Sequence, residues 1–390
     1  MNPSAAGWIH KLLKEVEKNN LFLKYDEEVF YEALRTSGFI YGSNLDVAAQ
    51  VIKKRDLTEG ELCKTNLCLA LYYTHSNSNS KTTFIDSAIN FYTAINEIKS
   101  SFFKDLLGGK KSSEQLEKIL HKRIQIDANI LTKNFNYFII NALLYVDVLA
   151  YKEYLEKHAV SINYIKKLEA SIVAISLDVL NSKETKNKYD DSLIKLFESS
   201  LRYHDNNNID YKKAIKNIKT DLEKYYILDL ACMATWSDHM IDIEEERFIE
   251  KLGNDLQLSK SRIHQSIKTV NHFYTTNKDN IALLSSKNIV QSFYNNSSKM
   301  VKKLIVRNSK RLYQELKDSK ELMVLLSQST VRDLNKEEQK KVQEQLMDIF
   351  KSIPSLAIFL LPGGALLLPL VVKFIPKLLP SAFDENRIEE

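Results

Sequence analysis

Apolar residues recur at intervals of three and four along most of the chain, and short polar stretches interrupt them. This spacing places the apolar side chains on one face of an α-helix. The polar stretches 75–81, 181–189 and 204–208 are rich in Asn, Ser and charged residues, as connections between helices usually are. The pattern therefore predicts an all-α, multi-helical body, in which residues 1–225 form an N-terminal helical domain of no recognised type.

Between Phe135 and Ala150, apolar residues cover both sides of the expected helix. A helix that is apolar all round is normally buried in a protein core or spans a membrane. Asn136, Asn141 and Asp147 interrupt this run, and polar groups of this kind are costly inside a bilayer. The pattern favours a central, fully packed helix over a membrane span at this position.

The strongest pattern lies near the C-terminus, where no residue of the run 353–372 is charged. A helix rises about 1.5 Å per residue, so about 20 residues match the ~30 Å hydrocarbon layer of a bilayer. Buried helices of globular proteins rarely contain so long an apolar run. We predict one membrane segment at 353–376, which is either a spanning helix kinked at Pro362-Gly363-Gly364 or a re-entrant hairpin.

The charges on the two sides of this segment predict its orientation. Several lysines precede it, whereas the tail that follows it is mostly acidic. Under the positive-inside rule, the large N-terminal body then faces the cytoplasm or the matrix, and the N-terminus shows no secretory signal pattern. The predicted membrane motif consists of Pro354, Pro362, Gly363, Gly364, Pro369, Lys373, Phe374, Pro376 and Pro380.

Composition supports helices over sheets and gives little indication of catalysis. The 390 residues include only 9 Gly and 6 Pro, too few for the many turns of a sandwich or barrel. The net charge of +5 is too small to indicate a nucleic-acid partner by itself, and the three cysteines form no C-x-x-C pair. The glycines of 108–112 lack the order of a phosphate-binding loop, and no other catalytic motif occurs. We therefore expect no enzyme, no small-molecule substrate and no organic cofactor.

The region from Tyr226 to Ile267 reads as an apolar helix that ends near Asp238, followed by a second helix that Asp242 caps. The acidic loop and the glutamate-rich start of the second helix resemble the tellurite-resistance TerB-like family. The resemblance covers about forty residues and implies a small all-helical domain, which we place at 226–275.

The acidic loop offers a candidate metal site at Asp238, Asp242 and Glu245, with His239 beside them. Several carboxylates in one short loop suit a divalent cation such as Ca²⁺ or Mg²⁺. The loop lacks the residue order of a calcium-binding loop, however, and acidic groups are also favourable at the start of a helix because of its dipole. Both interpretations, metal ligation and helix capping, follow from the same residues.

Residues 276–319 are predicted to connect this region to the membrane segment through basic amphipathic helices. Met300, Val301, Leu304, Ile305 and Leu312 form an apolar stripe. The opposite face carries Lys299, Lys302, Lys303, Arg307, Lys310 and Arg311. Cations arranged in this way can bind anionic lipid or the phosphate backbone of ribosomal RNA, and they are also common on a solvated helix face.

The C-terminal segment has a second, more specific pattern of proline, leucine and aromatic residues, namely Ile353-Pro354, Leu356, Phe359, Leu367-Leu368-Pro369, Lys373-Phe374, Pro376 and Leu378-Leu379-Pro380. Upstream lie Thr330, Leu334, Glu337-Glu338, Lys340-Lys341 and Asp348-Ile349-Phe350. Together these residues resemble the Letm family of leucine zipper and EF-hand containing transmembrane proteins. The resemblance extends over about 320–387.

The Letm resemblance implies a protein of a bacterial or mitochondrial inner membrane, with membrane lipid and the ribosome as partners. It also implies a part in cation/proton exchange, although Ala365 stands where the family, shortly after its central proline, has an acidic residue. The family's ribosome-facing domain, which follows its membrane segment, is expected to be mostly absent or replaced by the N-terminal helices. We therefore expect a membrane-anchored, non-enzymatic, ribosome-binding protein, with cation/proton exchange and a TerB-like ion-sensing or envelope-stress scaffold as alternatives.

Overall fold

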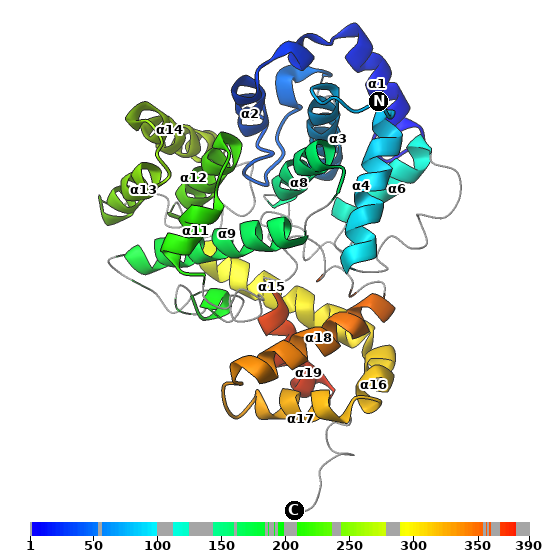
Figure 1. Ribbon diagram of the computed structural model, residues 1–390, viewed down its shortest axis with the longest axis vertical. Helices are drawn as coiled ribbons and strands as arrows, with labels where there is room; N and C mark the ends of the chain where they lie inside the picture. Colours follow the sequence, from blue (N-terminus) through cyan, green and yellow to red (C-terminus); the bar gives the residue numbers. More distant parts are fainter. Residues whose placement is uncertain are drawn as a thin grey trace, which may run out of the picture.

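The computed structural model describes residues 2–53, 57–99, 112–124, 143–159, 162–183, 186, 191, 194–198, 209–235, 243–277, 289–353, 356, 359 and 367–379. All regular structure in these residues is helical, as the sequence pattern predicts, and they contain no strand. Figure 1 shows a larger body, which contains the N-terminus, and a smaller helical lobe at the opposite end of the long axis.

The first part of the body is built around α3, whose residues are buried on all sides. Its helices are α1 (Trp8–Lys18), η1 (Leu21–Lys24), α2 (Glu27–Thr36), η2 (Ala48–Gln50), α3 (Glu59–Ser76), α4 (Phe84–Lys99), α6 (Ser113–Ile124) and α8 (Leu144–Lys157). Thr58 and Glu61 form a capping box that starts α3, because each side chain accepts from the backbone N–H of the other residue. Every residue from Leu62 to Leu71 is then buried, and α3 packs against α4, α6 and α8.

The central helix that the sequence predicts at 135–150 is seen in its second half. Residues 135–142 lie outside the described residues, and α8 begins at Leu144. All eight residues from Leu144 to Tyr151 are buried, including Asp147. The described part of this helix therefore belongs to the core of the body, as expected.

The second part of the body contains α9 (Ile162–Ser182), α11 (Tyr211–Asn217), α12 (Asp221–Thr235), α13 (Ile243–Asp255) and α14 (Lys260–Asn277). Helices α12, α13 and α14 pack against one another, and α12 also packs on α9. At Gly253 the helices approach so closely that a Cβ atom would lie 2.4 Å from Ile263. The predicted helix pair within 226–267 is thus a packed group of three helices.

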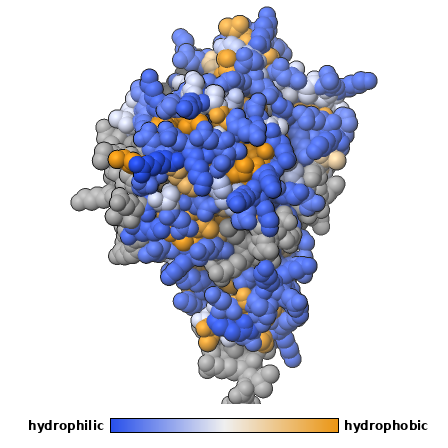
Figure 2. All heavy atoms as spheres, turned by 60° about the vertical axis from the view of Figure 1, so that its left-hand side comes forward, coloured by the Kyte–Doolittle hydropathy of each residue, from blue (hydrophilic) through white to orange (hydrophobic). Residues whose placement is uncertain are grey.

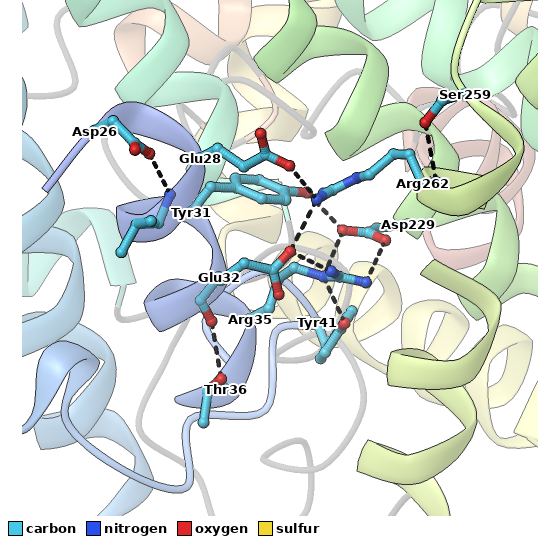
Figure 3. A network of polar contacts seen from close by, with 11 residues as sticks. Asp26, Glu28, Tyr31, Glu32, Arg35, Thr36, Tyr41, Asp229, Ser259 and Arg262 are labelled. Carbon is cyan, nitrogen blue, oxygen red and sulfur yellow. Dashed lines mark hydrogen bonds and ion pairs between the residues drawn. The ribbon is translucent and has the colours of Figure 1, made fainter. Parts of the chain in front are cut away.

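A buried polar network joins the two parts of the body (Figure 3). Asp229 of α12 accepts hydrogen bonds from Tyr31 and Arg35 of α2, at 2.7 and 3.0 Å. These three side chains are fully buried, and burial together with the Asp229 charge raises the pKa of Tyr31. Arg262 of α14 completes the network through an ion pair of 2.9 Å with Glu32. Its hydrogen bonds and ion pairs hold α2 against α12 and α14, with Asp229 as the buried acceptor at the centre.

A second buried ion pair lies inside the first part of the body. Arg123 of α6 donates to both carboxylate oxygens of Asp147 on α8, at 2.8 and 3.1 Å. Tyr92 of α4 donates to the same carboxylate at 3.2 Å. This explains why Asp147 interrupts an otherwise apolar helix: it is a buried acceptor shared by three helices.

The smaller lobe, which we call the C-terminal lobe, comprises α15 (Ile289–Arg307), α16 (Ser309–Lys317), α17 (Lys320–Gln328), α18 (Lys336–Ser352) and α19 (Leu368–Leu378). Helix α19 packs against α15 and α17, and α17 packs against α16 and α18 (Figure 1). Glu321 of α17 accepts from Lys341 and Gln345 of α18, at 2.7 and 3.0 Å. The lobe therefore has an apolar centre and polar contacts between its helices at the surface.

The predicted membrane segment at 353–376 contributes α19 to the centre of this lobe. Leu368, Val371 and Ile375 of α19 are at most 1 % exposed. Pro369 lies in the first turn, where a missing N–H costs nothing, so the helix can start there. None of the described helices combines the length and the apolar character needed to cross a bilayer. The single spanning helix is thus a prediction that the described residues do not support.

Candidate functional site

The basic amphipathic helix that the sequence predicts is two helices, α15 and α16, which meet at Asn308. The Asn308 side chain donates to the carbonyl oxygen of Leu304 at 2.6 Å, a bond that competes with the regular helix ladder. Val301, Leu304 and Ile305 are buried against the rest of the lobe, as predicted. Leu312 continues the buried stripe on α16, so the break between the helices preserves the amphipathic pattern.

The opposite side of these helices is a cationic surface, which we call the basic face. It consists of Lys299, Lys302, Lys303, Arg307, Lys310 and Arg311. All of these residues are exposed except Lys303, which is partly exposed. Lys299, Lys303, Lys310 and Arg311 form no ion pair with a described residue. Four cations with no carboxylate partner among the described residues give this face a positive field that can attract an anionic polymer.

The basic face is attached to the C-terminal apolar segment by direct contact. The Lys302 ammonium lies 4.7 Å from the centre of the Phe374 ring of α19. Phe374 itself is buried, and α15 is the principal neighbour of α19. Any change that displaces α19 should therefore also displace the helix that carries most of the basic face.

The turn between α17 and α18 carries a second, well-ordered set of charges. Asn335 and Glu338 form a capping box at the start of α18. Arg332 donates two hydrogen bonds to the Glu338 carboxylate, at 2.7 and 2.8 Å. The bonds from Arg332 and from the backbone N–H of Asn335 lower the pKa of Glu338 to about 2. Glu338 therefore stays ionised and holds the turn at all moderate pH values.

The predicted membrane motif is only partly described. Pro354, Pro362, Gly363, Gly364 and Pro380 lie outside the described residues. The other four, Pro369, Lys373, Phe374 and Pro376, all lie on α19.

On α19, Lys373 is exposed beside a cluster of aromatic residues. Its ammonium group donates to the Tyr294 hydroxyl of α15 at 3.0 Å. The described hydrogen bond of this residue is thus with protein.

The candidate metal residues are not brought together among the described residues. Asp238, His239 and Asp242 lie outside them, and Glu245 is buried on α13. The Glu245 carboxylate faces the buried Lys183 ammonium at 4.0 Å, so a cation already lies beside it. Within the described part of the chain, no group of three or more His, Cys, Asp or Glu side chains could hold a metal ion. Metal binding at this loop stays a prediction.

The structure adds a pocket that the sequence analysis does not predict. It lies between the C-terminal lobe and residues 194–198 of the body, and Lys195, Arg332, Lys373 and Lys377 line it. These residues come from three separate regions of the chain. Only Lys373 is in the predicted motif, because no local pattern connects the other residues with it.

Figure 2 shows a face of the molecule on which hydrophilic residues predominate and apolar residues form small, separate patches. In the lobe, the large apolar side chains that are exposed include Val306, Val324 and Val331. Val306 lies on α15, within the basic face. On the described surface, charged residues are therefore better suited than apolar area to bind a partner.

In a comparison with known families, residues 334–390 match the model described as LETM1-like, RBD. The matched residues begin at the α17–α18 turn and include α18 and α19. No curated protein and no solved structure matches the chain, and no family match supports the TerB-like resemblance at 226–275. The match thus places residues similar to the family's ribosome-facing domain at 334–390, within the region that the sequence analysis compares with the Letm family. In residues 334–390, the chain is similar to the ribosome-binding domain of the LETM1-like family.

Proposed function

We propose that this chain is a Letm-like, non-enzymatic protein that binds ribosomes through its C-terminal lobe. The proposal rests on one observation, which is that the basic face and the matched segment belong to the same packed unit. The match to the ribosome-binding domain covers α18 and α19, and α19 packs against α15, which carries most of the basic face. A partner as large as a ribosome that docks on this lobe can therefore contact both the matched residues and the cations of α15 and α16.

The chemistry of the basic face fits the phosphate backbone of ribosomal RNA. Each Lys or Arg that neutralises a phosphate releases condensed counterions, so binding weakens as the salt concentration rises. The slope of log K against log salt is about −0.7 to −0.9 per phosphate contact. Six contacts at the basic face would thus give a slope of about −4 to −5. Phosphate contacts carry no sequence information, so the matched helices α18 and α19 would supply selectivity for the ribosome.

Co-sedimentation of the full chain with purified ribosomes over a series of salt concentrations tests this proposal. We expect the fraction bound to fall steeply with salt. Replacing Lys299, Lys303, Lys310 and Arg311 by Gln should reduce the salt slope by about 3. Lys302 is left intact because it contacts Phe374.

The matched control replaces four exposed lysines of the body, Lys11, Lys14, Lys53 and Lys81, by Gln. This control removes the same net charge, so it should leave the slope unchanged if the basic face is the binding surface. Equal losses in both variants would mean that only total charge matters. Binding that survives high salt in the basic-face variant would contradict the role given to these residues.

We also propose that the chain is attached to a bacterial or mitochondrial inner membrane, as its Letm resemblance implies. The uncharged run 353–372 supports this, and much of it lies outside the described residues. The same run contains no titratable group, so cation/proton exchange has no proton carrier there. The full chain should remain in the membrane fraction after an alkaline wash. Its release would contradict attachment through the apolar run and would leave the ribosome test unaffected.

A further inference from the structure

A pocket of about 490 Å³ opens between the C-terminal lobe and the body, at the side of the lobe formed by the α17–α18 turn and α19. On the body side, Lys195 and Leu196 line it. On the lobe side, α19 contributes Lys373 and Lys377, which are one helical turn apart. The volume lies in the range of small-molecule sites, about 300 to 1,000 Å³.

The charges that line this pocket do not balance. Arg332 is compensated by its two hydrogen bonds to Glu338, and Asp333 is the only carboxylate among the described residues that line the pocket. Lys195, Lys373 and Lys377 form no ion pair with a described residue. Three ammonium groups therefore line the pocket with a single carboxylate beside them. Like charges one turn apart on α19 repel each other, so a bound anion would remove an unfavourable interaction.

The polar groups beside these lysines also suit an anion. The Tyr294 hydroxyl accepts a hydrogen bond from Lys373, so its own proton is free to be donated to a ligand. The hydroxyls of Ser329 and Thr330 donate to helix carbonyl oxygens, at 2.7 Å each, so they are not available as donors and the Tyr294 hydroxyl is the neutral donor used here. Pro369 and Leu370 add an apolar wall. The site thus combines cationic donors with room for a small organic group.

We propose that this pocket binds a phosphomonoester, whose dianionic phosphate is held by Lys195, Lys373 and Lys377 and by the Tyr294 hydroxyl. A phosphomonoester carries about two negative charges and three terminal oxygens at neutral pH, which matches several ammonium donors better than a single carboxylate does. Two kinds of molecule carry such a phosphomonoester group: a soluble organic phosphate and the lipid phosphatidic acid, which carries it as its headgroup. The site is distinct from the basic face, so it goes beyond the proposed ribosome binding.

A ligand in this pocket would connect the two parts of the molecule. Lys195 lies in the short helical stretch 194–198, which stands between α9 and α11 of the body in the sequence, whereas Tyr294, Lys373 and Lys377 belong to the lobe. A phosphate held by both sides stabilises the folded chain by mass action, because it binds only when both sides are in place. The expected signature is a melting temperature that rises with ligand concentration.

The test uses the full chain and glycerol 3-phosphate, a soluble phosphomonoester that is also the headgroup unit of phosphatidic acid. Calorimetry should show saturable binding at one site. Lys373→Gln and Lys377→Gln should each weaken it about tenfold, the usual effect of losing one charge-assisted hydrogen bond. Lys195→Gln should do the same from the body side. Lys320→Gln, an exposed lobe lysine outside the pocket, is the matched control and should have no effect.

Vesicles distinguish the two sources of the phosphate. The basic face can also attract anionic vesicles, so the vesicle assay compares the full chain with the pocket variants. If vesicles of phosphatidylcholine with one-fifth phosphatidic acid bind the chain more strongly than pure phosphatidylcholine vesicles, and the three pocket variants lose this difference while Lys320→Gln keeps it, the ligand is a lipid headgroup. Binding of glycerol 3-phosphate without this pocket-dependent vesicle binding assigns a soluble ligand. The proposal is overturned if neither probe binds, or if binding is equal in the three pocket variants and the control. All variants leave the basic face intact and no probe contains a ribosome, so failure here does not bear on ribosome binding.

Discussion

The burial of α19 gives the sharpest stability prediction, which concerns Ile375→Ala. Ile375 is 0 % exposed on α19, which packs against α15 and α17. Removing a buried Ile side chain to Ala costs about 2–5 kcal/mol, because apolar burial is lost and a cavity remains. A whole domain is stable by only about 5–15 kcal/mol, so this change should loosen the entire C-terminal lobe.

Hydrogen exchange measured by mass spectrometry can read this loss locally, in detergent-free buffer. Each 1.4 kcal/mol corresponds to a factor of ten, so amides of α15 and α17 should exchange at least about 30-fold faster in the variant. Lys377→Ala is the matched control, because its side chain is exposed on the same helix. Unchanged protection of α15 and α17 in the Ile375 variant would refute the packing of α19 inside the lobe.

Three further predictions concern buried or paired groups. Asp229→Ala leaves the Arg35 guanidinium buried without its main partner, so the free energy of unfolding measured by urea denaturation should fall by about 3–5 kcal/mol. Glu32→Gln, at the edge of the network, should lower it less. Because the folded pKa of Glu338 is about 2, below its ordinary 4.5, its contribution to stability is complete above pH 4.5 and is lost as the pH falls toward 2. The Glu338→Gln variant should lack the loss of hydrogen-exchange protection in α18 that the native chain shows between pH 4.5 and 2. If both proteins lose protection equally over this range, groups other than Glu338 cause the loss. Cys63, Cys68 and Cys232 are buried, and burial raises the pKa of their thiols, so a thiol reagent should label them only in denaturant. Rapid labelling of the native chain would contradict the core described for these three residues.

Local patterns predict the helices well, because the signals that start and stop a helix lie within a few residues. The sequence places the end of one helix near Asp238 and the start of the next after Asp242, and α12 ends at Thr235 while α13 begins at Ile243. The basic amphipathic pattern likewise predicts which residues of α15 are buried. It does not predict the break at Asn308, where the side-chain amide bonds to the Leu304 carbonyl oxygen.

Contacts between distant parts of the chain could not be predicted in this way. Hydropathy shows that a segment avoids water, but it does not show whether protein or lipid covers it. The apolar side chains of α19 are covered by α15 and α17, which come much earlier in the sequence. The ion pair of Arg35 with Asp229 joins residues 194 positions apart, and the pocket lysines 195 and 373 are nearly as distant. These sites arise from tertiary packing alone.

Site-specific photocrosslinking to purified ribosomes tests the central claim, ribosome binding through the C-terminal lobe, most directly. A photoreactive amino acid is placed at position 310 on the basic face, or at position 14 on α1 of the body, both of which are exposed lysines. We predict crosslinks to ribosomal RNA from position 310 that disappear at high salt, and none from position 14. Equal crosslinking from both positions, or crosslinking from position 14 alone, would contradict the account.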